Sequence, residues 1–255
     1  GRDVLRYEDA PDPVPDEGEV LVRVRACGLN HFDVDLRENV SRWPLPLPWT
    51  LGVEFAGEIA GVGPGVSGIS EGERVWVLHE LPCMECQYCV EGMDNLCENA
   101  RMYSVQMPGG YAEYVIAPVE AIFPLADDTS FDSAAAGQIV FTTAWHMLVT
   151  RGKVRPGETV LVSAAGSGVG HAAIQIAKYA GAKVITTAGS QHKLDAALAD
   201  GADGVINYNE GSVTERAIEL NDGKLVDLVI EHIGGEQFGQ CINTLRKNGR
   251  LVTCG

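Results

Sequence analysis

The sequence predicts an α/β protein in which a β-rich domain is followed by a doubly wound parallel sheet. In the first half, short strand-like segments are separated by Gly, Pro and acidic turns, which is typical of a compact β domain. In the second half, strand-like and helix-like segments alternate, and the strand-like ones are almost continuously apolar, as in a parallel sheet with both faces covered. We therefore expect one domain over residues 1–130 and a second over residues 131–255.

The individual elements follow from local patterns. In the first domain, strands are expected at residues 20–25, 55–59 and 74–78. In the second domain, strands are expected at residues 159–163, 183–187, 204–207, 226–230 and 250–253. The connecting helices are expected from the end of the first of these strands to about Ala180, before Gly181, and then over residues 193–200, 213–221 and 238–247.

Composition restricts the class of partner. The chain has 45% hydrophobic residues, enough for a large core, and no apolar run of membrane-spanning length. Its net charge is −16, from 35 acidic and 19 basic residues, which argues against nucleic acid or an anionic membrane as partner. We therefore expect a small-molecule ligand or substrate.

Four cysteines stand close together, with two, two and seven residues between them, and predict a structural Zn(Cys)4 lobe over about residues 80–100. The expected ligands are Cys83, Cys86, Cys89 and Cys97. The alternatives are two disulfides, a [4Fe–4S] cluster or four incidental thiols. An odd total of seven cysteines and no recognisable signal peptide favour a reducing, cytoplasmic compartment, which suits disulfides poorly.

A glycine-rich turn opens the second domain and predicts a dinucleotide site. It reads AAGSGVG over residues 164–170, between the first apolar strand and an amphipathic helix. Small residues at such a turn let backbone N–H groups and the helix N-terminus approach a pyrophosphate, although a plain tight turn is the alternative. The expected cofactor contacts are Gly166, Ser167, Gly168, Val169 and Gly170.

The end of the second strand of this domain favours NADP(H) over NAD(H). A site selective for NAD usually places Asp or Glu there to accept from the ribose 2′-hydroxyl. This chain instead has Gly189 and Ser190, followed by Lys193, so a hydroxyl and a positive charge are available to a 2′-phosphate. The alternative is that Lys193 only begins a solvated helix.

Taken together, these motifs resemble the medium-chain dehydrogenase/reductase superfamily, which contains zinc alcohol dehydrogenases and quinone oxidoreductases. The matching segments are GLNHFD at 28–33, LGVEFAG at 51–57, the four cysteines, GGYAEY at 109–114, TAW at 143–145 and the glycine turn. The resemblance implies a GroES-like catalytic domain followed by a Rossmann domain, an active site in the cleft between them, and a homodimeric or homotetrameric parent protein. It also implies that Thr143 lies by the nicotinamide, and that His31 contacts the cofactor pyrophosphate unless it is simply exposed. Further contacts along the cofactor are expected from His232, Ile233 and Gly255.

The departures from the alcohol dehydrogenases of this superfamily concern their catalytic zinc. At the three positions where the resemblance implies metal ligands, this chain has Asn30, Val53 and Ile139. Phe32 stands where those enzymes have a proton-relaying hydroxyl. We therefore expect no catalytic zinc, and chemistry in which charge spreads into an enolate or quinol rather than resting on one oxygen.

The sequence thus predicts an NADPH-dependent reductase of quinones or α,β-unsaturated carbonyls. Asn30 is the candidate for orienting the nicotinamide amide or polarising the substrate carbonyl, and a turn-capping Asn is the alternative. Two other functions remain open: an alcohol dehydrogenase that works without the usual ligands, and a non-enzymatic dinucleotide-binding protein. The chain begins inside what the superfamily makes its first hairpin and ends after the fifth Rossmann strand, so we expect a piece of a longer polypeptide.

Overall fold

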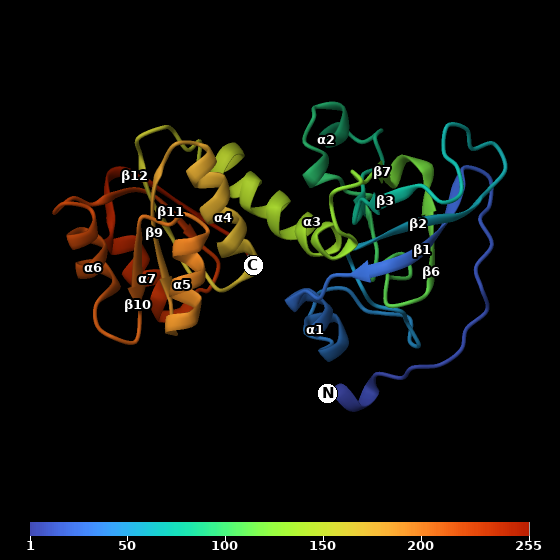
Figure 1. Cartoon of the computed structure of the whole chain (residues 1–255), viewed down its shortest axis with the longest axis horizontal. Helices are drawn as coiled ribbons and strands as arrows, with labels where there is room; N and C mark the ends of the chain where they lie inside the picture. Colours follow the sequence, from blue (N-terminus) through green and yellow to red (C-terminus); the bar gives the residue numbers. More distant parts are fainter. Residues whose placement is uncertain (255) are drawn as a thin grey trace. The chain divides into compact units, whose positions relative to one another are not determined.

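The computed structural model describes residues 1–254, which form two compact units (Figure 1). The first unit is Gly1–Ile139 and the second begins at Val140. The division falls within one helix, α3 (Phe131–Trp145), so the domain limit expected at residue 130 stays a prediction. No helix in the described part of the chain combines the length and the apolar character needed to span a membrane.

The first unit is built on a five-stranded antiparallel sheet in the order β6-β1-β2-β3-β7. Its strands are β1 (Glu19–Cys27), β2 (Phe55–Val62), β3 (Arg74–Val77), β6 (Tyr114–Pro118) and β7 (Ile122–Pro124). Burial alternates along β3 and β6, so every second side chain enters the core. Val20, Val22 and Phe55 are among the fully buried side chains of that core, and the three strands expected from the sequence are confirmed.

Short elements complete the first unit. Helix α1 (His31–Glu38) follows β1 and packs Leu36 into a small second core with Leu51 and Val105. The segment between β3 and β6 holds β4 (Glu80–Leu81), α2 (Gln87–Val90), η2 (Asp94–Leu96) and β5 (Arg101–Met102). Strands β4 and β5 pair with each other and flank the four cysteines in the sequence. Like η2, the elements η1 (Arg2–Val4) and η3 (Val119–Ala121) are short 3-10 helices.

The second unit contains a five-stranded parallel sheet in the order β10-β9-β8-β11-β12, which confirms the Rossmann sheet. The strands are β8 (Thr159–Val162), β9 (Lys183–Ala188), β10 (Gly204–Asn207), β11 (Val226–Glu231) and β12 (Leu245–Thr253). Successive strand residues enter different cores: Val160 and Val162 pack with one cluster, and Leu161 between them packs with another. Both faces of the sheet are therefore buried, which explains the continuous apolar runs in the sequence.

Helices cover the two faces. The helices are α4 (Gly168–Tyr179), α5 (Gln191–Ala199), α6 (Val213–Leu220) and α7 (Gly235–Asn243). Apolar residues of α4 and α5 belong to one core cluster, and those of α6 and α7 to the other. Helix α4 ends as expected, with Ala180 as its C-cap and Gly181 at a φ of 78°. Beyond α3, residues His146–Arg151 continue as a short π-helix, η4, that the sequence analysis does not foresee.

The last expected helix is wrong at its end. The sequence pattern places it over residues 238–247, but α7 stops at Asn243 and β12 begins at Leu245. Leu245 pairs with Val226 of β11, and Arg246 forms an ion pair with Asp227 on the same strand at 2.6 Å. Strand pairing and this ion pair override the local helical pattern of the segment.

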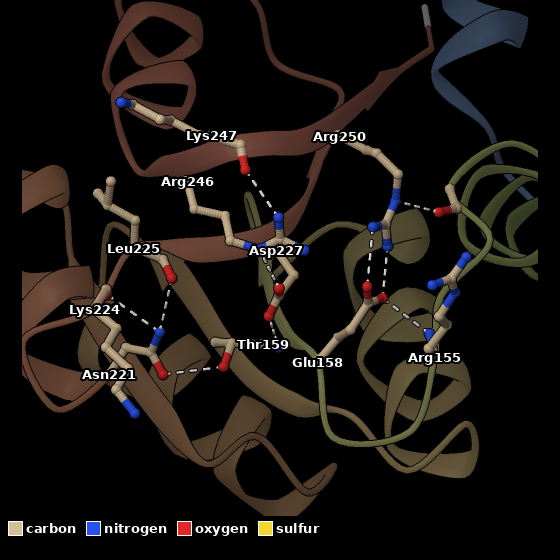
Figure 2. A network of polar contacts seen from close by, with 11 residues as sticks. Arg155, Glu158, Thr159, Asn221, Lys224, Leu225, Asp227, Arg246, Lys247 and Arg250 are labelled. Atoms are coloured by element: carbon tan, nitrogen blue, oxygen red, sulfur yellow. Dashed lines mark hydrogen bonds and ion pairs between the residues drawn. The ribbon is translucent and has the colours of Figure 1, made fainter.

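A network of polar contacts joins the strands near their amino-terminal ends (Figure 2). The Asp227 carboxylate accepts hydrogen bonds from the Thr159 backbone N–H at 2.8 Å and from Arg246 at 2.6 Å. Glu158 accepts two hydrogen bonds from the Arg250 guanidinium, at 2.9 and 2.6 Å. These contacts tie the start of β8 to β11 and β12, and the Arg250–Glu158 pair has the forked geometry of two parallel charge-assisted hydrogen bonds.

Candidate functional site

The cysteine lobe has the geometry of a closed metal site. The four predicted ligands, Cys83, Cys86, Cys89 and Cys97, are free thiols whose sulfur atoms all lie within 4.8 Å of one another. A tetrahedral zinc ion with Zn–S bonds of about 2.3 Å needs sulfur atoms about 3.8 Å apart, so the cluster fits that ion. Together with the comparisons below, this supports a structural zinc ion held by these residues.

Backbone N–H groups around the lobe donate hydrogen bonds to its sulfur atoms. Met84 has a φ of 61°, and the Cys86 N–H points at the Cys83 sulfur over 3.4 Å. The Cys83 N–H donates in turn to the Cys97 sulfur over 3.2 Å. Hydrogen bonds from the backbone N–H groups of Glu85 and Cys86 lower the pKa of Cys83 to about 6. This favours the thiolate of Cys83, which is the form that binds metal, whereas burial and the neighbouring thiols raise the pKa of Cys89 to about 12.

In the first unit, Asn30 is the N-cap of α1 and is held by two buried carboxylates. Its backbone N–H donates to Asp33 over 2.9 Å, and its side-chain Nδ2 donates to Glu54 over 2.8 Å. The other oxygen of Glu54 accepts from the Ile139 backbone N–H at 2.9 Å. Asp33 also accepts from the Gly52 N–H at 3.2 Å, so the two motif segments around Asn30 and Gly52 are joined.

The side chains at the two other positions that the resemblance links to a catalytic metal are apolar. Val53 is fully buried and belongs to the packing of the unit, while Ile139 is half-buried. Phe32 is half-buried and makes an edge-to-face contact with Trp43, with ring centroids 5.5 Å apart. None of these three side chains can bind a metal or relay a proton.

Burial dominates the electrostatics around Asn30. Burial raises the pKa of Glu54, hydrogen bonds from Ile139 and Asn30 oppose the shift, and the Asp33 charge adds to it. Burial, with the charges of Asp33 and Glu54, also raises the pKa of Cys27 to about 12. Cys27 is therefore an inert thiol rather than a nucleophile.

In the second unit, the glycine turn and the end of β11 are joined by one short contact. The Ser167 hydroxyl lies 2.6 Å from His232 Nε2 and accepts the Gly170 N–H at 2.9 Å. A Cβ at Gly170 would lie 2.2 Å from the Ala164 carbonyl oxygen, so the last glycine of the turn has to be glycine. Burial lowers the pKa of His232, although the Glu231 charge opposes this, and the ring is therefore held neutral.

Lys193 lies against the same turn. A Cβ at Gly166 would come within 2.5 Å of the Lys193 Cδ, so the missing side chain at Gly166 leaves space for the lysine methylenes. Ser190 is the N-cap of α5, and Gly189 leaves space for the ring of Tyr208. The turn and the candidate NADP(H) residues thus share one end of the sheet, although their contacts with a cofactor stay a prediction.

Two residues at this end were missed by the sequence analysis. Ser163 directly follows β8 and is fully buried, and Glu231 ends β11 and is 1% exposed. One Glu231 oxygen accepts from the N–H groups of Ile233 and Gly234 at 2.7 and 3.0 Å. A polar residue at the carboxy-terminal end of an otherwise apolar strand was the available signal for both.

Other predicted site residues lie apart from these two groups or outside the described chain. Thr143 is half-buried on α3, in the second unit. His31 is highly exposed at the start of α1, with its ring 3.8 Å from Asp35. Ile233 is exposed after β11, and Gly255 lies outside the described residues. Their functional roles stay predictions, as do those of Gly168 and Val169 at the start of α4.

Comparison with known families matches both halves of the chain. Residues 16–127 match the alcohol dehydrogenase GroES-like domain. Residues 168–255 match the zinc-binding dehydrogenase family.

Known proteins similar to the chain carry two kinds of name. Quinone oxidoreductase from Mus musculus is 34% identical over 259 residues, covering 100% of the chain and 70% of that protein. Alcohol dehydrogenase from Geobacillus stearothermophilus is 33% identical over 255 residues, covering 98% of the chain and 74% of that protein. The crystal structure of an NAD-dependent alcohol dehydrogenase superposes with a TM-score of 0.95 at 43% identity, covering 99% of the chain and 74% of that structure. The relatives therefore agree on the fold and the redox class and differ in substrate.

Proposed function

The chain belongs to the medium-chain dehydrogenase/reductase superfamily, and from that premise we propose that it transfers a hydride from NADPH to a quinone or an α,β-unsaturated carbonyl without a catalytic metal. Membership makes it an oxidoreductase dependent on a nicotinamide dinucleotide, with a small molecule as substrate. The substrate class, the choice of NADPH and the absence of a catalytic metal are the parts we propose.

One observation carries the proposal: Asn30, Val53 and Ile139 replace the three expected metal ligands. Val53 is fully buried in apolar packing, and the Asn30 amide is already hydrogen-bonded to Glu54. Reducing an isolated carbonyl concentrates negative charge on one oxygen, which calls for a Lewis acid. A conjugated carbonyl or a quinone spreads that charge, so hydrogen-bond donors and acceptors suffice.

The residues of the chain supply binding and orientation. Bound nicotinamide supplies the hydride. The N–H groups of the glycine turn and the amino-terminal end of α4 favour a pyrophosphate, since the turn keeps Gly170 and Ser167 closes it. We assign Asn30 and Thr143 to the nicotinamide end of the site, where they would set the orientation of the ring.

The NADPH preference rests on Ser190 and Lys193. The Ser190 Oγ is buried and has no hydrogen-bond partner within residues 1–254, so it is available to a ligand. Lys193 is exposed at the start of α5, with its methylenes seated against Gly166. A 2′-phosphate would find a hydroxyl and an ammonium group here. The acidic residue that binds the ribose 2′-hydroxyl in NAD-selective sites is absent from this position.

The decisive test is a substrate panel measured together with metal content. The purified protein should oxidise NADPH with quinones and enones, and it should contain one zinc ion per chain. Replacing both Cys86 and Cys89 by serine should remove that zinc and destabilise the lobe. A second metal ion per chain, whose removal abolishes turnover of simple alcohols, would reject the proposal.

The second candidate function is oxidation of alcohols with NAD. The observation that favours it is the high structural similarity to an NAD-dependent alcohol dehydrogenase. The same panel separates the two candidates, because this enzyme class would turn over alcohols with NAD and would depend on a metal near Asn30. Equal affinity for NADH and NADPH would reject only the cofactor part of the first proposal.

A further inference from the structure

A tight turn interrupts β12 where this strand begins to pair with β11. Val226 of β11 pairs with Leu245, and Leu228 pairs with Arg250. One residue of β11 therefore faces four residues of β12, and we call this four-residue segment the 246–249 turn. Such a bulge leaves the extra residues of the longer strand outside the ladder of paired residues.

The geometry of the 246–249 turn suits an asparagine followed by a glycine. Asn248 has a φ of 63°, a conformation that asparagine adopts more readily than most residues with a side chain. A Cβ at Gly249 would lie 2.9 Å from the Arg246 carbonyl oxygen and 3.0 Å from the Leu245 side chain, so glycine relieves crowding there. Asn248 is the only asparagine in the sequence that is followed by glycine.

This pair of residues has a characteristic chemistry. The backbone nitrogen that follows an asparagine can attack the side-chain carbonyl carbon and close a succinimide ring. Glycine favours the attack, because it has no side chain to shield the nitrogen and because its backbone has the most conformational freedom. Asn248 is exposed and Gly249 is half-buried, so solvent base and water reach the turn.

We propose that Asn248 is a modification site, which deamidates without an enzyme in the folded protein. The Gly249 nitrogen loses its proton to solvent base and forms a bond to the Asn248 Cγ. The bond from Cγ to Nδ2 then breaks, and the amide nitrogen leaves with a proton as ammonia. Water opens the succinimide at either carbonyl, giving aspartate or isoaspartate, and no group is oxidised or reduced.

The products of this reaction lie between two ion pairs that stabilise the second unit (Figure 2). Arg246 donates to Asp227 over 2.6 Å, and Arg250 donates two hydrogen bonds to Glu158, at 2.9 and 2.6 Å. Both products place a negative charge at position 248, between the two arginines in the chain. Isoaspartate also lengthens the main chain between them by a methylene group. We therefore expect isoaspartate to weaken both ion pairs and to lower the free energy of unfolding.

The test follows the mass of the peptide that contains Asn248 while the purified chain is incubated at mildly alkaline pH. That peptide should gain about 1 Da, the difference between an amide and a carboxylic acid. The rate should rise with pH, because the attacking nitrogen must lose its proton. Asn39 is an internal control in the same sample, since it is also exposed and has a φ of 55°, but is followed by Val40. Its peptide should react at least about tenfold more slowly, because the branched valine side chain shields the nitrogen.

Two variants separate the effects of the reaction on stability. Asn248→Gly keeps a residue that tolerates a positive φ and has no amide to lose, so its denaturation midpoint should not change during the incubation. Asn248→Asp carries the new charge without the extra methylene group. The isoaspartate form, isolated by ion exchange from the incubated protein and identified by peptide fragmentation, should unfold at a lower denaturant concentration than Asn248→Asp.

Three results would overturn the inference. If Asn248 kept its amide as long as Asn39 does, the turn would not be a modification site. Conversion in the denatured chain without conversion in the native protein would show that the fold protects Asn248. If the isoaspartate form unfolded at the same denaturant concentration as the unmodified protein, the proposed effect on the two ion pairs would be wrong. None of these measurements depends on the cofactor or the substrate, so the proposed function is tested separately.

Discussion

The two ends of the parallel sheet in the second unit differ in how their buried and half-buried polar groups are paired. At the amino-terminal end, Asp227 and Glu158 are paired with arginines and with a backbone N–H (Figure 2). At the carboxy-terminal end, four buried side-chain atoms have no hydrogen-bond partner within residues 1–254. These atoms are Ser163 Oγ, Ser190 Oγ, Glu231 Oε2 and His232 Nδ1.

This difference teaches which end serves stability and which serves a ligand. A buried polar atom without a partner lowers the free energy of unfolding by about 1–3 kcal/mol, so four such atoms at one end of a sheet destabilise the fold substantially. In open α/β sheets, ligands bind beyond the carboxy-terminal ends of the strands, where such atoms can be completed by the ligand. We therefore expect substitutions at the amino-terminal end to change folding, and substitutions at the other end to change cofactor binding.

The largest effect should come from Asp227→Ala. The change removes the acceptor of the Thr159 N–H and leaves Arg246 without its ion pair, so the free energy of unfolding should fall by about 2–3 kcal/mol. Chemical denaturation measures this loss, and NADPH affinity of the folded protein should stay unchanged. Glu219→Ala, which breaks an exposed ion pair with Arg216, is the control and should cost well under about 1 kcal/mol. A parallel loss of NADPH affinity in Asp227→Ala would break the comparison.

At the opposite end, Lys193→Ala should weaken NADPH binding by about 1–3 kcal/mol, the value of a hydrogen bond to a charged group, with little change in NADH binding. Gly166→Ala should act through the same lysine, because its new Cβ would displace the Lys193 methylenes at little cost to the fold. The two changes should therefore not add: in the Lys193→Ala background, Gly166→Ala should leave the ratio of NADPH to NADH affinity unaltered. Full additivity in that ratio would show that Gly166 does not position Lys193.

A smaller effect should distinguish a ligand-binding hydroxyl from a structural one. Ser190→Ala removes a buried Oγ that has no partner in the described chain, so it should leave stability unchanged or slightly raised. It should also weaken NADPH binding about three- to tenfold by removing one hydrogen bond. Thr159→Val is the matched change at the other end, where the hydroxyl bonds to Asn221 at 3.0 Å, and it should lower stability and spare binding. A loss of stability in Ser190→Ala would contradict the assignment of that hydroxyl to a ligand.

Much of the second unit, and the cysteine lobe of the first, could be predicted because their signals are local. The β10 strand was predicted at its exact limits, and the cysteine spacing and the glycine turn each predict a compact structure within a few residues. The boundary between α7 and β12 could not be predicted, because it depends on pairing with β11 and on the Asp227–Arg246 contact. Long-range contacts also explain why the sequence assigned no functional role to Glu54 or Glu231: their partners lie on other segments or depend on a particular backbone conformation.

The last and smallest expected effect is a separation of the two ends by pH. Lysine, arginine and backbone donors lower the pKa of Asp203 and Asp227 at the amino-terminal end, although burial opposes the shift. Because their pKa is lower in the folded state, they stabilise the fold fully above the unfolded value of about 3.9 and lose this contribution as the pH falls through the folded value. Burial lowers the pKa of His232 at the other end, so protonation of its ring destabilises the folded state. The free energy of unfolding therefore begins to fall at a higher pH here, below the unfolded pKa of about 6.5.

Two acid transitions in the free energy of unfolding should therefore be separable by substitution. His232→Gln should flatten the pH dependence of the free energy of unfolding that begins near pH 6.5, and should leave the dependence at more acidic pH intact. Asp227→Asn should flatten the pH dependence only below about pH 4. Denaturant titrations at closely spaced pH values measure both. Saturating NADPH should deepen the first transition and not the second, because only His232 lies at the end of the sheet that we assign to the cofactor. If one substitution flattened both regions, the two ends would be coupled, and the division between a stabilising end and a binding end would be wrong.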